Sequence, residues 1–160
     1  MSGLPISVCG AGSWIDLLSW AAWGINRPES GLRTAPSASN RQEIDIYVLL
    51  EEGAYLYDAK ANMLATVRSG EINAVARWGA PVNLAFISDL TKMRGNSRED
   101  KIITTSADTG FISQNAYLYC ASQGLATVVR GGFNRSELSA ELGLGPDQYI
   151  TYVQTVGYPK

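Results

Sequence analysis

The sequence contains no histidine among its 160 residues. Histidine is the usual general base near neutral pH, the partner of serine and cysteine nucleophiles, and a common zinc ligand. Its absence excludes Ser-His and Cys-His triads and His-ligated zinc. We therefore predict no metal site, and any chemistry must come from an organic cofactor or from unaided carboxylates.

Cysteine, basic residues and long apolar runs are also scarce. Cys9 and Cys120 lie far apart, which fits reduced thiols better than a disulfide framework. The formal net charge of -2 gives no basic footprint for nucleic acid or anionic lipid. The apolar stretch 15–25 is too short for a membrane helix, and no basic residue of a signal peptide precedes Arg27. These features predict a soluble cytoplasmic protein without nucleic-acid or membrane partners.

The composition is that of an ordinary globular domain. Hydrophobic residues make up 46% of the chain and charged residues 18%. A chain of this length can bury one core, and neither an internal repeat nor a linker divides it. We predict a single domain over residues 1–160.

Hydrophobic periodicity and capping signals indicate four helices. They are predicted over 13–24, 70–78, 106–125 and 134–142. In the third helix, an apolar stripe formed by Ile112, Ala116, Tyr119 and Cys120 is widened by Phe111 and Leu118 almost to a full circle. That width predicts a helix inside the protein.

Strand signals alternate with these helices. Segments 44–50 and 55–58 predict a hairpin, and 126–133 and 148–157 predict later strands. The nearly all-apolar segment 82–89 predicts a central strand buried on both faces. Because a hairpin and short connectors argue against a regular βαβ series, we predict an α+β, three-layer fold with a mainly antiparallel sheet.

Two glycine- or serine-rich stretches require a decision between turn and ligand site. The stretch ISVCGAGSWI (6–15) resembles a dinucleotide-binding turn, but Ile15 occupies the third glycine position and too little chain precedes it, so we reject this interpretation. The stretch RTAPSASN (33–40) lies in a long polar loop that is predicted over residues 26–40. By itself it is compatible with an ordinary turn or with a backbone cradle for a ligand.

The surroundings of this loop carry a family resemblance. The run WAAWGINRPESGLRTAPSASNRQEIDIYVLLEEGAYLYD, the later SADTGFISQNAYLYCASQGLATVVRGGF and the final VGYP occur in this order and spacing. Over residues from about 17 to 160 the sequence resembles the nitroreductase family, the FMN-dependent NAD(P)H oxidoreductases. The resemblance implies a nitroreductase-like fold of central sheet and flanking helices, with residues 1–16 atypical.

The resemblance implies that the loop contacts a flavin. In the family this loop lies against the isoalloxazine ring of a flavin bound mostly by the partner subunit. The implied contacts are Pro36, Ser37, Ala38 and Asn40. Small residues suit a close backbone approach, and Ser37 and Asn40 can form hydrogen bonds with the polar edge of the ring. Gln42 could touch the ligand or fix the loop, and a capped turn without ligand is the alternative for the whole stretch.

A second implied contact comes from the double glycine. The resemblance places a backbone N–H of Gly131 at flavin N5, and Gly132 beside it, where missing side chains let the backbone approach. The alternative is a turn or bulge glycine. Since the reduced flavin supplies the electrons, no catalytic side chain is required.

The sequence departs from the family at its start. The family has an Arg-x-Ser-x-Arg type motif that clamps the FMN phosphate, whereas Arg27 is the first basic residue here. Lys160 and Arg77 are the candidate replacements, with solvated surface charges as the alternative. Because charge-assisted phosphate contacts are strong, we expect weak FMN binding, and a truncated start is one explanation.

The implied activity is passage of electrons from NADH or NADPH through FMN to a small-molecule acceptor such as a nitroaromatic or quinone, in a ping-pong cycle. A homodimer with flavin at the subunit interface is expected, and segment 91–104 is expected to shape the acceptor pocket. The choice between the two nicotinamide donors stays open. The alternative function is a non-catalytic flavin-binding or interaction domain of the same fold.

Overall fold

The computed structural model describes residues 13–160. Its centre is a six-stranded sheet in the order β5-β4-β3-β6-β8-β7, with every neighbouring pair antiparallel. The strands are β3 (Ile44–Leu50), β4 (Gly53–Asp58), β5 (Met63–Ser69), β6 (Val82–Asp89), β7 (Ala126–Arg130) and β8 (Gln148–Gly157). A separate ribbon is formed by β1 (Ile25–Arg27) and β2 (Leu32–Arg33).

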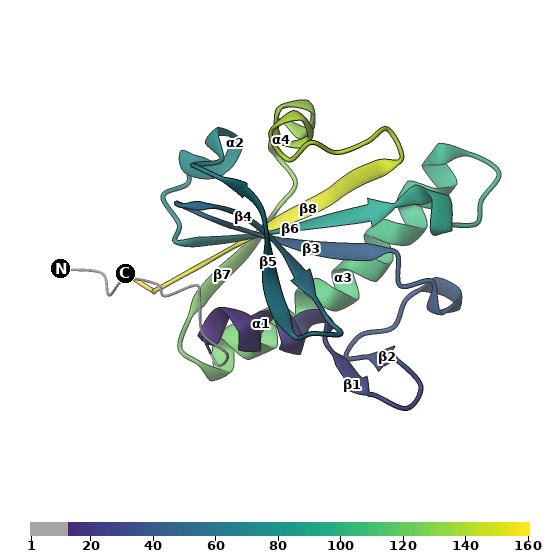
Figure 1. Ribbon diagram of the computed structural model, residues 1–160, viewed down its shortest axis with the longest axis horizontal. Coiled ribbons are helices and arrows are strands. Elements are labelled where there is room, and N and C mark those ends of the chain that lie inside the picture. Colours follow the sequence, from purple (N-terminus) through teal and green to yellow (C-terminus); the bar gives the residue numbers. More distant parts are fainter. Residues whose placement is uncertain (1–12) are drawn as a thin grey trace.

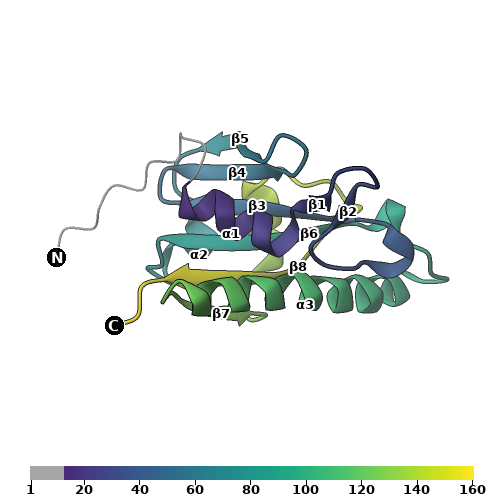
Figure 2. The ribbon, with the colours of Figure 1, turned by 90° about the horizontal axis from the view of Figure 1, so that it is seen from below.

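Helices cover both faces of the sheet (Figures 1 and 2). The helices are α1 (Trp14–Trp23), α2 (Asn73–Ala76), α3 (Arg98–Ser122) and α4 (Arg135–Glu141), with short 3-10 turns η1 (Ala38–Asn40) and η2 (Leu90–Lys92). Figure 1 shows α1 and α3 on one side of the sheet and α2 and α4 on the other. This arrangement confirms the predicted α+β, three-layer, mainly antiparallel fold.

Alternation along the strands separates two cores. In β3, Ile46 and Val48 face the core under α1 and α3, whereas Tyr47 and Leu49 face the core under α2 and α4. Strand β6 lies between β3 and β8, and all its residues except Asp89 are buried. The predicted central strand buried on both faces is confirmed.

Helix α3 begins earlier than predicted and is exposed along one side. Ser97 accepts a hydrogen bond from the backbone N–H of Asp100 (3.0 Å), and this capping box starts the helix at Arg98, within segment 91–104 and ahead of the predicted start at residue 106. The prediction that the helix lies wholly inside is wrong, because Phe111 and Leu118 are 49% and 61% exposed. Ile112, Ala116 and Cys120 form its buried stripe.

Several short elements differ from the sequence prediction. The edge strand β5 was not predicted, because most of its side chains are exposed and show no buried alternation. The stretch 26–40, predicted as loop, contains most of the β1–β2 ribbon and η1, and the helix predicted over 70–78 is reduced to α2. Short elements such as these depend on tertiary partners rather than on local pattern.

The structure describes only one of the two cysteines and only the end of the glycine-rich stretch 6–15. Cys9 and most of the 6–15 turn lie outside the described residues. Cys120 is a buried free thiol, and burial raises its pKa. Within residues 13–160, no helix has the length and apolar character that crossing a membrane requires.

Candidate functional site

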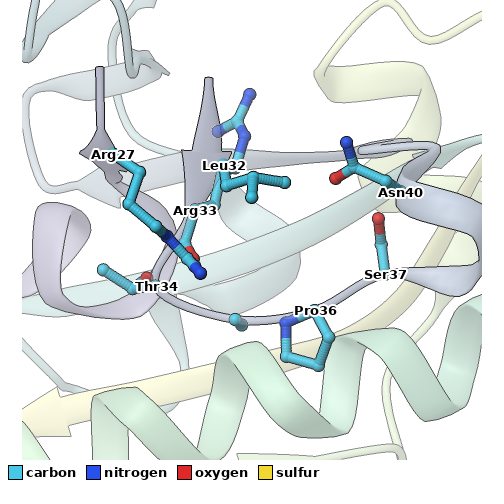
Figure 3. A pocket seen from close by; sticks show the side chains of 8 residues that line it. Arg27, Leu32, Arg33, Thr34, Pro36, Ser37 and Asn40 are labelled. Carbon is cyan, nitrogen blue, oxygen red and sulfur yellow. The ribbon is translucent and has the colours of Figure 1, made fainter. Parts of the chain in front are cut away.

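A pocket lies where the β1–β2 ribbon meets the segment that leads into β3 (Figure 3). Its volume is about 380 Å³, toward the lower end of the range for small-molecule sites. Its lining consists of Arg27, Leu32, Arg33, Thr34, Ala35, Pro36, Ser37 and Asn40. Three of the predicted flavin contacts, Pro36, Ser37 and Asn40, therefore line one pocket.

We call residues 33–42 the cradle loop. Its backbone is unusual, because Ser39, Asn40 and Gln42 have φ angles of 52°, 51° and 48°. The left-handed region is unfavourable for residues other than glycine, and such residues persist only where surrounding contacts hold them. The shape of the cradle loop therefore depends on its hydrogen bonds.

Gln42 supplies several of these hydrogen bonds. Its backbone N–H donates to Ser37 Oγ (2.9 Å), and its Nε2 donates to the carbonyl oxygen of Gly31 (3.0 Å) and to Asn40 Oδ1 (3.1 Å). Its Oε1 accepts from Arg33 Nε (3.0 Å). These hydrogen bonds hold the loop, which is one of the two roles that the sequence left open for Gln42.

Arg33 ties the cradle loop to α1. Its guanidinium lies 4.6 Å from the centre of the Trp23 ring, and its Nη1 donates to the Trp23 carbonyl oxygen (2.9 Å). Burial lowers the pKa of Arg33. Trp23 in turn donates from Nε1 to the carbonyl oxygen of Ile44 (2.7 Å), so helix, loop and strand form one connected unit.

The other side of the cradle loop rests on α3. The backbone N–H of Ala38 donates to Asp108 Oδ2 (2.8 Å), and the Asp108 side chain is only 4% exposed. Asn115, also on α3, donates from Nδ2 to the carbonyl oxygen of Thr34 (3.1 Å). Ala38 and Gln42, unlike the other predicted loop contacts, do not line the pocket.

A buried carboxyl group follows the cradle loop directly. Glu43 is completely buried, and burial, together with the neighbouring Asp108, raises its pKa to about 7. Sequence reasoning missed both residues. Their contact joins positions far apart in the chain, and nothing in the local sequence of either residue signals it.

The lining of the pocket presents hydroxyl and amide groups from Thr34, Ser37 and Asn40. The buried Thr34 Oγ1 in the lining has no hydrogen-bond partner among the described residues. An unsatisfied buried hydroxyl is rare in a native structure and needs an explanation. A flavin ring, whose edge carries N–H and C=O groups, offers partners for such a hydroxyl and for the Ser37 hydroxyl.

Gly131 and Gly132 follow the edge strand β7 and are exposed. A Cβ atom on Gly131 would lie at an ordinary 3.6 Å from Tyr152, and one on Gly132 would meet nothing. Neither glycine has a positive φ. The fold of one chain therefore does not require glycine at either position. Strands β6 and β8 separate β7 from β3, so these glycines do not join the cradle loop within one chain.

Arg77 and Lys160 are exposed and lie at the opposite end of the sheet from the cradle loop. Both adjoin the end where Val82 pairs with Val156, whereas the cradle loop enters β3 at Ile44, which pairs with Ser88. Segment 91–104 lies at the cradle-loop end, where Arg41 Nη1 donates to the Lys92 carbonyl oxygen (3.3 Å). One chain therefore does not bring all the predicted site residues together.

The three-layer fold and the cradle loop define a class of protein, and known protein families show which class it is. The model of the nitroreductase family matches residues 15–158. The chain therefore belongs to the nitroreductase family, and the resemblance noted in the sequence is confirmed.

Known relatives cover most of the chain. A crystal structure from Ralstonia eutropha JMP134, named as a nitroreductase, has 34% sequence identity and a TM-score of 0.85, and the match covers 100% of this chain and 76% of that one. A Methanocaldococcus jannaschii protein named as a nitroreductase is 27% identical over 74% of this chain and 67% of its own length. A Desulfovibrio desulfuricans nitroreductase structure in complex with FMN shares the fold, with 17% identity, a TM-score of 0.58 and coverage of 96% and 77%.

Proposed function

We propose that this chain is an oxidoreductase that binds FMN at the cradle loop and uses NADH or NADPH as electron donor. Membership of the nitroreductase family supports the reaction class. The observation that carries the proposal is the pocket itself. It combines a loop held against α1 and α3 with an unpartnered Thr34 hydroxyl in its lining.

The chemistry of the loop residues suits the face and edge of a flavin ring. Pro36 and Ala38 have small side chains that allow close approach of the backbone. Ser37 Oγ accepts a hydrogen bond from Gln42, so its hydroxyl hydrogen is free to donate to a ligand. Asn40 Oδ1 is likewise used within the loop, and its NH₂ group is left as the donor toward the pocket.

FMN, when bound, supplies two-electron redox chemistry at N5, so the protein itself contributes position, polarity and exclusion of water. The absence of histidine is compatible with this division of roles. We propose that the donor and the acceptor use the same site in turn, in a ping-pong cycle. The acceptor is a nitroaromatic, a quinone or a similar small molecule, and the protein works in the cytoplasm.

A homodimer completes the proposal. Gly131 and Gly132 present an open backbone that their own chain does not require, and they lie away from their own cradle loop. We propose that they face a flavin held against the cradle loop of a second copy. Arg77 and Lys160 are then the candidate phosphate contacts in the assembled dimer. Exposed apolar side chains on α1 and α3, Leu17, Trp20, Phe111 and Leu118, support such an interface.

Flavin reconstitution tests this function. Because weak binding is expected, purified protein is titrated with FMN to saturation and then mixed anaerobically with NADH or NADPH while the flavin absorbance is followed against FMN without protein. We expect at least one donor to bleach the bound flavin and a quinone to restore its colour. Bound FMN that neither donor bleaches would indicate the non-catalytic flavin-binding alternative, and a protein that binds no FMN at any concentration would refute the flavin site.

A further inference from the structure

Two carboxyl side chains are buried together behind the cradle loop. Asp108, on α3, accepts a hydrogen bond from the backbone N–H of Ala38 (2.8 Å). Glu43 is completely buried at the start of β3, and its Oε1 accepts from Thr105 Oγ1 (2.9 Å). The other oxygen, Glu43 Oε2, has no hydrogen-bond donor among the described residues. One carboxyl group thus holds the loop, and the other has an oxygen that no donor satisfies.

Among the described residues, no basic side chain contributes to the shift in the pKa of Glu43. Thr105 and Ser88, which complete the hydrogen-bond chain to Glu43, are neutral hydroxyls. The carboxylate of Asp89 on β6 is engaged by the backbone N–H of Thr91 (3.0 Å). Among the described residues, Asp108 is the charged group that acts on Glu43. Two ionised carboxylates would therefore repel each other in a dry site without a compensating cation.

We propose that Glu43 and Asp108 share one proton and that this carboxyl pair positions the cradle loop. With Glu43 protonated, its hydroxyl donates toward Asp108, while Asp108 accepts from the Ala38 N–H. With both ionised, an opening of the loop that admits water to Glu43 is favoured. In this role Glu43 and Asp108 are positioning residues that act on the flavin-facing segment 37–40, and this consequence rests on the proposed function.

The size of the effect follows from the protonation equilibrium. Burial and Asp108 together raise the pKa of Glu43 from 4.5 to about 7. An opening that fully hydrates Glu43 therefore becomes favoured by up to about 300-fold as pH rises, because each pKa unit is a factor of ten. The change takes place between these two values, from about pH 4.5 to about pH 7.

Hydrogen exchange of the Ala38 amide tests the pair directly in protein without flavin. Its protection factor is measured by NMR from about pH 5 to about pH 9, after correction for the intrinsic rate. We expect protection in the wild type to fall more than tenfold across this range, while the core amide of Ile87 stays protected. A constant protection factor for Ala38 would overturn the proposal.

Near-isosteric variants distinguish the effect of the proton on Glu43 from that of the hydrogen bond between Ala38 and Asp108. In Glu43→Gln the amide mimics the protonated carboxyl group, so Ala38 should remain protected at every pH. In Asp108→Asn the carboxamide can still accept from Ala38 while it donates to Glu43, so the pH dependence should weaken, and the burial of Glu43 should preserve the rest of it. Glu52→Gln, an exposed change in the β3–β4 turn, is the matched control and should behave as the wild type. A Glu43→Gln variant that keeps the wild-type pH dependence would contradict the proposal.

FMN affinity provides the second readout. If the cradle loop binds flavin, the wild type should lose FMN affinity as pH rises through about 7, and Glu43→Gln should not. Exchange results as expected without any FMN binding would leave the positioning role standing and refute the proposed function. FMN binding together with an Ala38 protection factor that does not change with pH would support the proposed function and refute the positioning role.

Discussion

At the residue scale, Gln42 connects more parts of the cradle loop than any other side chain in it. Its side-chain hydrogen bonds reach Gly31, Arg33 and Asn40. A polar side chain that uses its donors and acceptor in this way fixes one backbone path, here one with left-handed residues.

Substitution of Gln42 by alanine should therefore loosen the loop. We expect a loss of about 1–3 kcal/mol in unfolding free energy, because the partly buried Arg33 guanidinium and Gly31 carbonyl lose their hydrogen bonds to the Gln42 side chain. Urea denaturation measures this loss. Gln123→Ala, at an exposed glutamine after α3, should change the unfolding free energy by less than about 0.5 kcal/mol. Equal effects of the two substitutions would contradict the account.

The pH dependence of stability is a second residue-scale prediction. The pKa of Glu43 is raised in the folded protein, so its contribution to stability is fully present below about 4.5 and is lost as pH rises to about 7. We expect the loss to be at most about 3 kcal/mol, since part of the burial is relieved by relaxation. Thermal unfolding across this pH range measures it. Glu43→Gln should flatten the profile, and a wild type that gains stability over the same range would rule out this assignment.

How far the sequence predicts the site can be judged from individual residues. Pro36, Ser37 and Asn40, which the family resemblance implies as flavin contacts, line one pocket, because the local order of small and polar residues carries the resemblance; the flavin contacts themselves stay a prediction. The contact of Ala38 with Asp108 could not be predicted, because it joins a loop to a helix 70 positions later. The buried position of Glu43 also depends on tertiary packing rather than on its neighbours in the chain.

At the scale of elements, strong periodicity was the reliable signal. Strands β3 and β6 and the buried stripe of α3 were predicted because each carries a dense apolar pattern. Strand β5 was missed because an edge strand with exposed side chains has no such pattern. The inner and outer sides of α3 could not be distinguished, because Phe111 and Leu118 are apolar although they are exposed.

The buried and exposed sides of α3 provide a matched pair of substitutions. Ile112→Ala removes a completely buried side chain and should lower the unfolding free energy by about 2–5 kcal/mol through cavity formation. Leu118→Ala, on the exposed side, should leave the stability of the isolated chain within about 0.5 kcal/mol. Urea denaturation at low protein concentration makes the comparison. A larger loss from Leu118→Ala would show that the helix is buried differently.

At the scale of the whole molecule, the separation of the predicted site residues is the main finding. The cradle loop lies at one end of the sheet, Arg77 and Lys160 lie at the other, and Gly131 follows an edge strand. A single flavin can contact all three regions only in an assembly of two chains. This geometry supports the homodimer, which the sequence implied through the family resemblance.

The assembly has its own test. Light scattering of the concentrated protein should give a dimer mass, and Leu118→Asp should shift the equilibrium toward monomer because a charge would be buried in the apolar interface. The exposed Glu52→Gln variant serves as the control. A wild-type protein that binds FMN as a monomer would contradict the shared site.

The phosphate contacts are tested by comparing two ligands. Lys160→Ala should weaken the binding of FMN more than that of riboflavin, because only FMN carries the phosphate that a cation would neutralise. Arg77→Ala tests the other candidate in the same way. Titration of the flavin-free protein with both ligands measures the difference. Unchanged FMN affinity in both variants would remove these residues from the proposed site.

The central claim, that the cradle loop binds flavin, is tested most directly by a fluorescence titration with FMN. Asn40 and Asn62 both have φ angles of 51°, so glycine replaces either one without backbone strain. Asn40 lines the pocket, whereas Asn62 lies outside it between β4 and β5. The account predicts that Asn40→Gly weakens FMN binding about tenfold, the effect of one lost hydrogen bond to the ligand, and that Asn62→Gly leaves it unchanged. Equal FMN affinity in the two variants would contradict it.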